Sequence, residues 1–269
     1  MKKLVALALC LALCLALAAC GGSEKQTAGS ADAENSAAPA VPADGEWADE
    51  LGNATEQAYE VVSAKAEVYT VRGDTAHVRV VFGVRNLSPY PMASSAFARA
   101  NLSTADGAFS DSVYMDGASA LAAQPGETVY YFAYYSGTGL TEDTELTVEP
   151  VLSDLRLWMD GEQVEDFYRF FDAQDAAFTL DEDGTWLHVR AQLTNDSDAA
   201  VMPLGAIVFY DESGNVINGA LLGLDLLGDV SRVQPGDSAE IVGAVESYGT
   251  FTEADFADYD IYVYTQIGV

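Results

Sequence analysis

Residues 76–88 read AHVRVVFGVRNLS, and residues 185–197 read TWLHVRAQLTNDS. Aligned without a gap, both segments place apolar residues at every second position and then end in Asn-x-Ser. The apolar positions are Val78, Val80, Phe82 and Val84 in the first segment and Leu187, Val189, Ala191 and Leu193 in the second. An apolar period of two is typical of a β-strand that buries one face. We therefore predict that the two segments are equivalent core strands of an internal repeat.

Further landmarks recur in the same order. A turn at residues 104–107 corresponds to one at 211–214, and Gln-Pro-Gly at 124–126 corresponds to 234–236. Short strands separated by turns about every ten residues are typical of an immunoglobulin-type sandwich of about 100 residues. We predict an all-β protein with two tandem immunoglobulin-like antiparallel β-sandwich domains, while a jelly roll or a small barrel gives a similar pattern.

The N-terminus carries the features of a signal peptide. Lys2 and Lys3 precede an apolar run over residues 4–17, and the small residues Ala18 and Ala19 follow it. We divide the chain into a signal peptide at residues 1–19, a disordered tether at 20–45, a first sandwich at 46–152 and a second sandwich at 153–269. The tether is assigned because it contains almost nothing apolar to bury.

The end of the signal segment, Leu17-Ala18-Ala19-Cys20 followed by two glycines, resembles the lipobox of bacterial lipoproteins. This resemblance implies cleavage before Cys20 and a diacylglycerol attached to its sulfur. We therefore expect a lipid-anchored protein on the extracytoplasmic face of the bacterial membrane. An ordinary secretory signal that is cleaved nearby is the alternative.

The second repeat also shows a family resemblance. Asn195-Asp196-Ser197, then Phe209-Tyr210-Asp211 and later Pro235-Gly236-Asp237 resemble the FxLYD-type domains, which belong to a largely uncharacterised group of immunoglobulin-like domains of bacterial lipoproteins. The resemblance extends over residues 175–269 and is weaker over 66–152. It implies an extracytoplasmic β-sandwich and supplies no catalytic residues.

Charge and cysteine content exclude several classes of protein. The formal net charge is −30, and no basic patch is present, so nucleic-acid binding is not expected. Two of the three cysteines, Cys10 and Cys14, lie in the signal segment, which leaves only Cys20 after cleavage. A disulfide framework, a thiolate zinc site and a cysteine nucleophile are therefore excluded. Cations or a basic protein remain possible partners.

Few residues fit a catalytic site. The sequence has two histidines, His77 and His188, and both fall on the outward parity of the repeated strand, where we expect exposed side chains. No Gly-x-Ser-x-Gly or His-Glu-x-x-His motif is present. Paired carboxylates of the glycosidase kind are the one enzymatic alternative, because acidic residues are abundant. We predict no catalytic residues and no cofactor.

Asp181-Glu182-Asp183-Gly184 resembles a fragment of a calcium-binding loop. The glutamate that completes such a loop is missing at the required spacing. We therefore interpret the segment as a hairpin turn and predict no metal site, while weak calcium binding stays an alternative.

Residues 130–135 read YYFAYY, whereas the second repeat has EIVGAV at 240–245. Matching the two segments places Tyr130, Phe132 and Tyr134 on the outward face of the first repeat. An outward aromatic row can stack on sugar rings or fill a protein interface, so these three residues are candidate ligand-binding residues. Alternatively, the other domain or the segment Trp158–Phe171 covers the row.

These observations lead to one expected function and two alternatives. We expect a non-enzymatic surface lipoprotein, joined to the membrane through its N-terminal lipid, whose tandem domains act as a binding or scaffolding module in the bacterial envelope. Its partner is an envelope protein or a glycan. The alternatives are a glycan-binding module that uses the aromatic row and an envelope enzyme that uses paired carboxylates.

Overall fold

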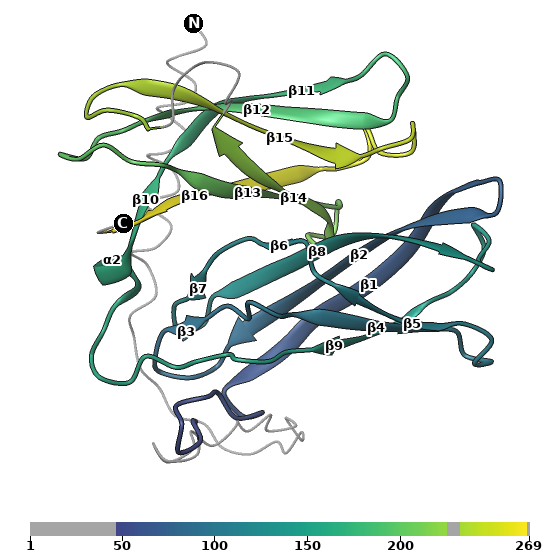
Figure 1. The fold of residues 1–269 in the computed structure, drawn as a ribbon, viewed down its shortest axis with the longest axis horizontal. Helices are drawn as coiled ribbons and strands as arrows, with labels where there is room; N and C mark the ends of the chain where they lie inside the picture. Colours follow the sequence, from purple (N-terminus) through teal and green to yellow (C-terminus); the bar gives the residue numbers. More distant parts are fainter. Residues whose placement is uncertain (1–46, 225–231, 268–269) are drawn as a thin grey trace, which may run out of the picture. The chain divides into compact units, whose positions relative to one another are not determined.

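The computed structural model describes residues 47–224 and 232–267, and the regular structure there is almost entirely β-strand (Figure 1). The all-β prediction is confirmed. The predicted signal peptide, the tether and the lipid attachment residue Cys20 lie outside the described residues. Within the described part, we find no helix with the length and apolar character needed to cross a membrane.

The first repeat forms three antiparallel sheets, with strand orders β1-β2-β8-β6, β5-β4-β9 and β3-β7. Its strands are β1 (Tyr59–Arg72), β2 (Thr75–Asn86), β3 (Met92–Ala93), β4 (Arg99–Ser103), β5 (Ser110–Tyr114), β6 (Gly117–Ala118), β7 (Ala122–Ala123), β8 (Thr128–Thr138) and β9 (Thr147–Val151). Phe82 of β2, Leu102 of β4 and Tyr131 of β8 belong to one buried apolar cluster. The two larger sheets therefore pack face to face as a sandwich.

The second repeat forms one sheet with the order β10-β16-β13-β14-β15-β12-β11. Its strands are β10 (Tyr168–Phe171), β11 (Ala173–Leu180), β12 (Trp186–Thr194), β13 (Leu204–Tyr210), β14 (Val216–Leu224), β15 (Ser238–Glu246) and β16 (Asp258–Gln266). β14 pairs with β15 only at Gly223 and Leu224. The sheet folds over at this narrow connection, because Leu187 of β12, Phe209 of β13 and Val263 of β16 share one buried cluster.

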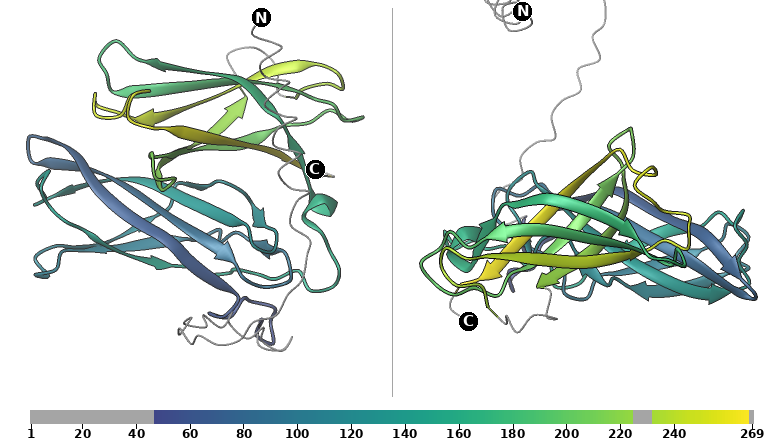
Figure 2. Two further views of the ribbon diagram at one scale, coloured as in Figure 1. Left: turned by 180° about the vertical axis from the view of Figure 1, so that it is seen from behind. Right: turned by 90° about the horizontal axis from the view of Figure 1, so that it is seen from above.

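The two repeats have the same strand connectivity. Figure 2 shows the ribbon from two further directions. In each, an initial hairpin (β1–β2, β11–β12) is extended by a later strand, β8 or β15. A second hairpin (β4–β5, β13–β14) is extended by the last strand, β9 or β16. The internal repeat predicted from the sequence is therefore a repeat of structure.

The Asn-x-Ser motif has the same role in both repeats. Asn86 donates its side-chain amide to the carbonyl oxygens of Tyr90 (2.7 Å) and Ala123 (3.1 Å), and its own Oδ1 accepts from the Ser88 backbone N–H (2.9 Å). Asn195 makes the matching bonds, to Ala199 O at 2.8 Å among others. Both asparagines are fully buried. Each amide therefore adds buried side-chain hydrogen bonds that tie the end of the core strand to two neighbouring segments.

β2 is buried on both faces, whereas β12 alternates between buried and exposed residues. The predicted apolar faces of both strands are buried. On the other face of β2, however, Arg79 is 5% exposed and Val81 is 2% exposed. These outward positions of β2 are buried because the second repeat lies on the outer face of the strand.

The contact between the repeats is an apolar cluster of its own. Val81 and Phe132 of the first repeat pack with Ala206, Val208 and Val216 of the second. β14 supplies much of this contact, since it approaches β2, β6 and β8. A side chain at Gly219 would place its Cβ 2.5 Å from the Phe132 ring. Glycine therefore gives the ring room to reach β14.

A cleft between the two repeats

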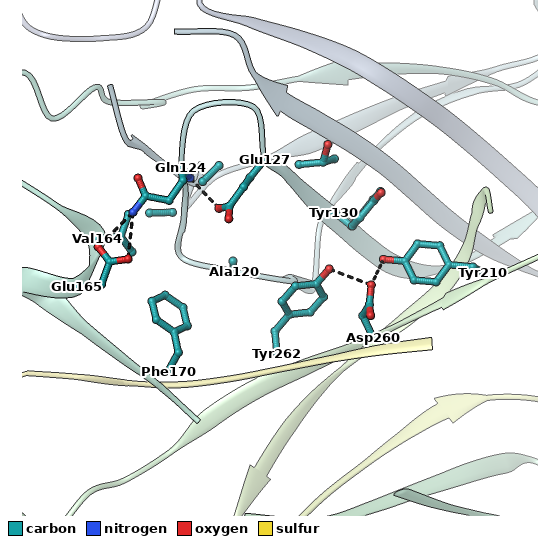
Figure 3. A pocket seen from close by; sticks show the side chains of 13 residues that line it. Ala120, Gln124, Glu127, Tyr130, Val164, Glu165, Phe170, Tyr210, Asp260 and Tyr262 are labelled. Carbon is teal, nitrogen blue, oxygen red and sulfur yellow. Dashed lines mark hydrogen bonds between the residues drawn. The ribbon is translucent and has the colours of Figure 1, made fainter. Parts of the chain in front are cut away.

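A cleft of about 490 Å³ opens beside this contact, between the two repeats and the segment that contains α2 (Val164–Phe167). A volume of this size is typical of small-molecule sites. Its lining comes from the loop around residues 120–128, from β8, α2 and β10, and from the ends of β13 and β16. Figure 3 shows acidic side chains toward two ends of the cleft, with Phe170 and Tyr262 between them.

Asp260 marks one end of the cleft. The Tyr210 hydroxyl donates to Asp260 Oδ2 at 3.0 Å, and the Tyr262 hydroxyl donates to the same oxygen at 3.4 Å (Figure 3). Burial, the largest cause, raises the pKa of Tyr262 to about 12 and lifts that of Tyr210 further above its ordinary value. Both hydroxyls therefore keep their protons at neutral pH and hold the carboxylate in a fixed orientation.

Glu165 marks the other end, and Gln124 links it to Glu127. The Gln124 side-chain amide donates to both oxygens of Glu165, at 3.3 and 3.2 Å, and the Gln124 backbone N–H donates to Glu127 Oε2 at 2.8 Å. Gln124 belongs to the first repeat, and Glu165 belongs to α2, in the segment that joins the two repeats. This polar contact therefore links the first repeat to α2 beside the cleft (Figure 3).

Aromatic rings form much of the surface between the two acidic ends. Tyr130 meets Tyr210 edge to face, with ring centroids 5.8 Å apart. Phe170 is 47% exposed although it is a large apolar residue. The described lining residues include no lysine, arginine or histidine. The cleft thus presents aromatic faces and carboxylates, which together suit a positively charged group with an apolar part.

The structure separates the three predicted aromatic residues. Phe132 is 3% exposed within the contact between the repeats. The Tyr134 hydroxyl donates to Asn218 Oδ1 at 2.8 Å, and burial raises the pKa of Tyr134 well above its ordinary value. Only Tyr130 reaches the cleft. The three side chains therefore do not form an open face for sugar stacking, because the second repeat covers the row, as the alternative held.

The two histidines have different surroundings. His188 is exposed, as predicted. The prediction is wrong for His77, whose side chain is 14% exposed and lies 3.8 Å from Glu246 Oε2 of the second repeat. Its ring lies 4.7 Å from the Tyr248 ring, and the Tyr69 hydroxyl donates to the same glutamate. His77 is thus part of the contact between the repeats.

Residues 181–184 form a turn between β11 and β12. Asp181 Oδ1 accepts from the Trp186 backbone N–H at 3.1 Å, and Asp183 Oδ1 accepts from the Thr185 N–H at 2.9 Å. Gly184 has a positive φ of 73°, a conformation that glycine adopts without strain. Within residues 47–224 and 232–267, no group of three or more His, Cys, Asp or Glu side chains is arranged to hold a metal ion.

Asp260, Tyr262 and Phe170 were not predicted as site residues from the sequence. A usable signal was present in β16, where Tyr259, Ile261 and Val263 face the core of the second repeat and the alternate residues Asp260 and Tyr262 face away from it. An aromatic residue on the outward parity of a strand indicates a second contact.

Searches of protein-family models, of curated proteins and of solved structures give no match for this chain. The lipobox resemblance and the FxLYD resemblance therefore stay predictions.

Proposed function

We propose that this protein is a non-enzymatic binding module of the bacterial envelope, anchored through a lipid on Cys20, with the cleft between its two repeats as the ligand site. In this proposal each repeat is an immunoglobulin-like domain. The lipobox-like sequence supports the location. The partner is an envelope component whose bound part enters the cleft.

One observation carries the proposal, namely that residues from both repeats and from the segment joining them converge on one cleft. Tyr130 comes from β8, Phe170 from β10 and Asp260 from β16. A half-exposed phenylalanine beside ordered carboxylates leaves apolar surface in water without an internal partner to cover it. Pockets that combine apolar surface with a few placed polar groups are typical ligand sites.

The proposal is tested by placing a photo-crosslinking amino acid at Phe170 in the full-length lipoprotein in its native envelope. Tyr114, which is 65% exposed on β5 and outside the cleft lining, is the matched control position. We expect the probe at residue 170 to give a discrete adduct that the probe at residue 114 does not give. A Cys20→Ser variant shows whether capture depends on the predicted anchor.

Identical adducts from both positions, or none from residue 170, would contradict a ligand site in the cleft. Loss of the adduct in a Tyr262→Ala variant, with the melting temperature preserved, would place the ligand against the aromatic surface.

A further inference from the structure

We propose that the cleft binds a linear organic dication, that is, two ammonium groups joined by an apolar chain. This inference rests on the proposed function and names the chemistry of its ligand. It follows from the sign, the position and the hydrogen bonding of the cleft side chains.

The charged side chains among the described lining residues of the cleft are all carboxylates. The described lining residues include Asp260, Glu127 and Glu165 and no basic side chain, in a chain with a formal net charge of −30. Among the residues that the structure describes, each carboxylate accepts hydrogen bonds only from neutral groups, namely tyrosine hydroxyls, an amide side chain or a backbone N–H. An anion is therefore repelled, and a cation neutralises charge that the protein leaves uncompensated.

The charges are placed at two ends. In Figure 3, Glu165 lies beyond Phe170 and Asp260 lies beyond Tyr262, whereas Glu127 lies across the cleft between the two rings. Between them lies Ala120, which offers no polar side chain. A ligand with a charge at each end and a methylene chain in the middle matches this distribution, because its chain covers apolar surface while both ends meet carboxylates.

Asp260 has one carboxylate oxygen that can accept a hydrogen bond from a ligand N–H. Both tyrosine hydroxyls donate to Oδ2, and within the described residues no donor reaches Oδ1. A primary ammonium group has three N–H donors and no acceptor, so one can bond Oδ1 while the positive charge faces the Tyr130 and Tyr262 rings. A quaternary ammonium group lacks the N–H that this carboxylate oxygen can accept.

Two sources supply this chemistry: a free polyamine and a peptide segment with two lysines. The test is calorimetric titration of the full-length lipoprotein in nonionic detergent micelles at neutral pH. The ligands are 1,4-diaminobutane, 1-aminobutane and 1-butanol, which differ in charge at similar chain length. We expect the diamine to bind about tenfold more tightly than the monoamine, with no measurable binding of the alcohol.

Two variants test the two ends of the cleft, and a third variant controls for the change in net charge. Asp260→Asn keeps an acceptor for both tyrosines, and Glu165→Gln lies on the exposed segment of α2. Each is expected to weaken the binding of the diamine about tenfold and to bring its affinity close to that of the monoamine. Glu182→Gln makes the same charge change in the β11–β12 turn, outside the cleft lining, and is expected to change affinity less than twofold.

Equal affinity for the three ligands would overturn the inference, and so would an equal loss in the Glu182→Gln control. A capped Lys-Gly-Lys peptide distinguishes the sources: binding tighter than that of the diamine supports a basic protein, and weaker binding supports a free polyamine. A crosslinked ligand at residue 170 together with no amine binding would leave the envelope-binding role standing and overturn only the dication.

Discussion

β2 and β12 occupy the same place in their repeats, yet they differ in what covers their outer faces. The outward residues of β12, among them His188 and Arg190, are exposed. In β2, Arg79 and Val81 are as buried as core residues. The difference is made by a few outward side chains. Val81 is paired with Phe132 across β2 and β8, whereas Arg190 is paired with Val242 across β12 and β15.

The same strand arrangement therefore occurs twice, once with the outer face of its core strand covered and once with that face exposed. The inward residues and the Asn-x-Ser caps are shared, and they determine the fold of each repeat. The outward residues determine what docks on it. Apolar outward residues in the first repeat hold the second repeat in place, and the cleft exists because the two repeats are held together.

The largest effect is expected from giving β2 the outward charge of β12. Val81→Arg buries an unpaired charge between the repeats, so we expect the free energy of unfolding to fall by about 3–5 kcal/mol. The reverse change, Arg190→Val, loses an exposed ion pair with Glu240 (3.0 Å) and is expected to cost less than about 1 kcal/mol. Urea denaturation of the full chain measures both. Equal losses would contradict a covered β2.

The shared caps are expected to give equal effects in both repeats. Asn86→Ala and Asn195→Ala each remove two buried side-chain hydrogen bonds to carbonyl groups and the Oδ1 that accepts from a serine N–H, and each is expected to cost about 2–3 kcal/mol. Asn101→Ala is the control, because its amide makes one long bond of 3.4 Å to Glu149. A cost for Asn195→Ala that is no larger than the control would break the equivalence of the two caps.

The free energy of unfolding is expected to fall at alkaline pH because of Tyr262 in the cleft. Burial raises the pKa of Tyr262 from 10.0 to about 12, so the folded state favours the neutral hydroxyl. The stability that this group contributes is complete below pH 10 and is lost as the pH rises to about 12. Tyr262→Phe is expected to reduce the loss of unfolding free energy between pH 10 and 12, and the exposed control Tyr114→Phe is not. Identical pH profiles for both variants would contradict the raised pKa of Tyr262.

The smallest effect is expected at Arg79. Its guanidinium lies 4.7 Å from both the Tyr69 and Phe251 ring centroids, but its Nε and Nη2 have no hydrogen-bond partner among the described residues. The attraction to the rings and the cost of burying the charge oppose each other, so Arg79→Met is expected to change the unfolding free energy by less than about 1 kcal/mol. A loss above about 2 kcal/mol would mean that the charge itself stabilises the contact.

Local patterns in the sequence predicted the strands and their equivalence. Alternation at Val78 to Val84 is a property of a short segment, and the structure confirms its burial. The Asn-x-Ser motifs were recognised as landmarks of the repeat, but the burial of Asn86 and Asn195 was not predicted. The pairing of the two repeats could not be predicted, because an outward apolar residue such as Phe132 shows that a face is covered without showing by what. The run Leu204–Tyr210 carried a related signal, since a nearly continuous apolar strand indicates burial on both faces.

The cleft was harder to predict than the strands. Asp260, Phe170 and Glu165 lie on separate segments, and they come together only once the repeats have docked. Tyr130 was identified because an aromatic residue on an outward face is unusual, whereas single carboxylates in a chain of −30 charge carry little information.

Hydroxyl-radical footprinting of the full-length lipoprotein, read by mass spectrometry, tests the covered face of the first repeat most directly. We predict that Phe132 is protected to the same degree as the core residue Tyr131 and that the partly buried Tyr134 is also protected, while Tyr114, which is 65% exposed, is modified rapidly. Modification of Phe132 and Tyr134 at the rate of Tyr114 would contradict it, because the aromatic row would then face water and the cleft between the repeats would not exist.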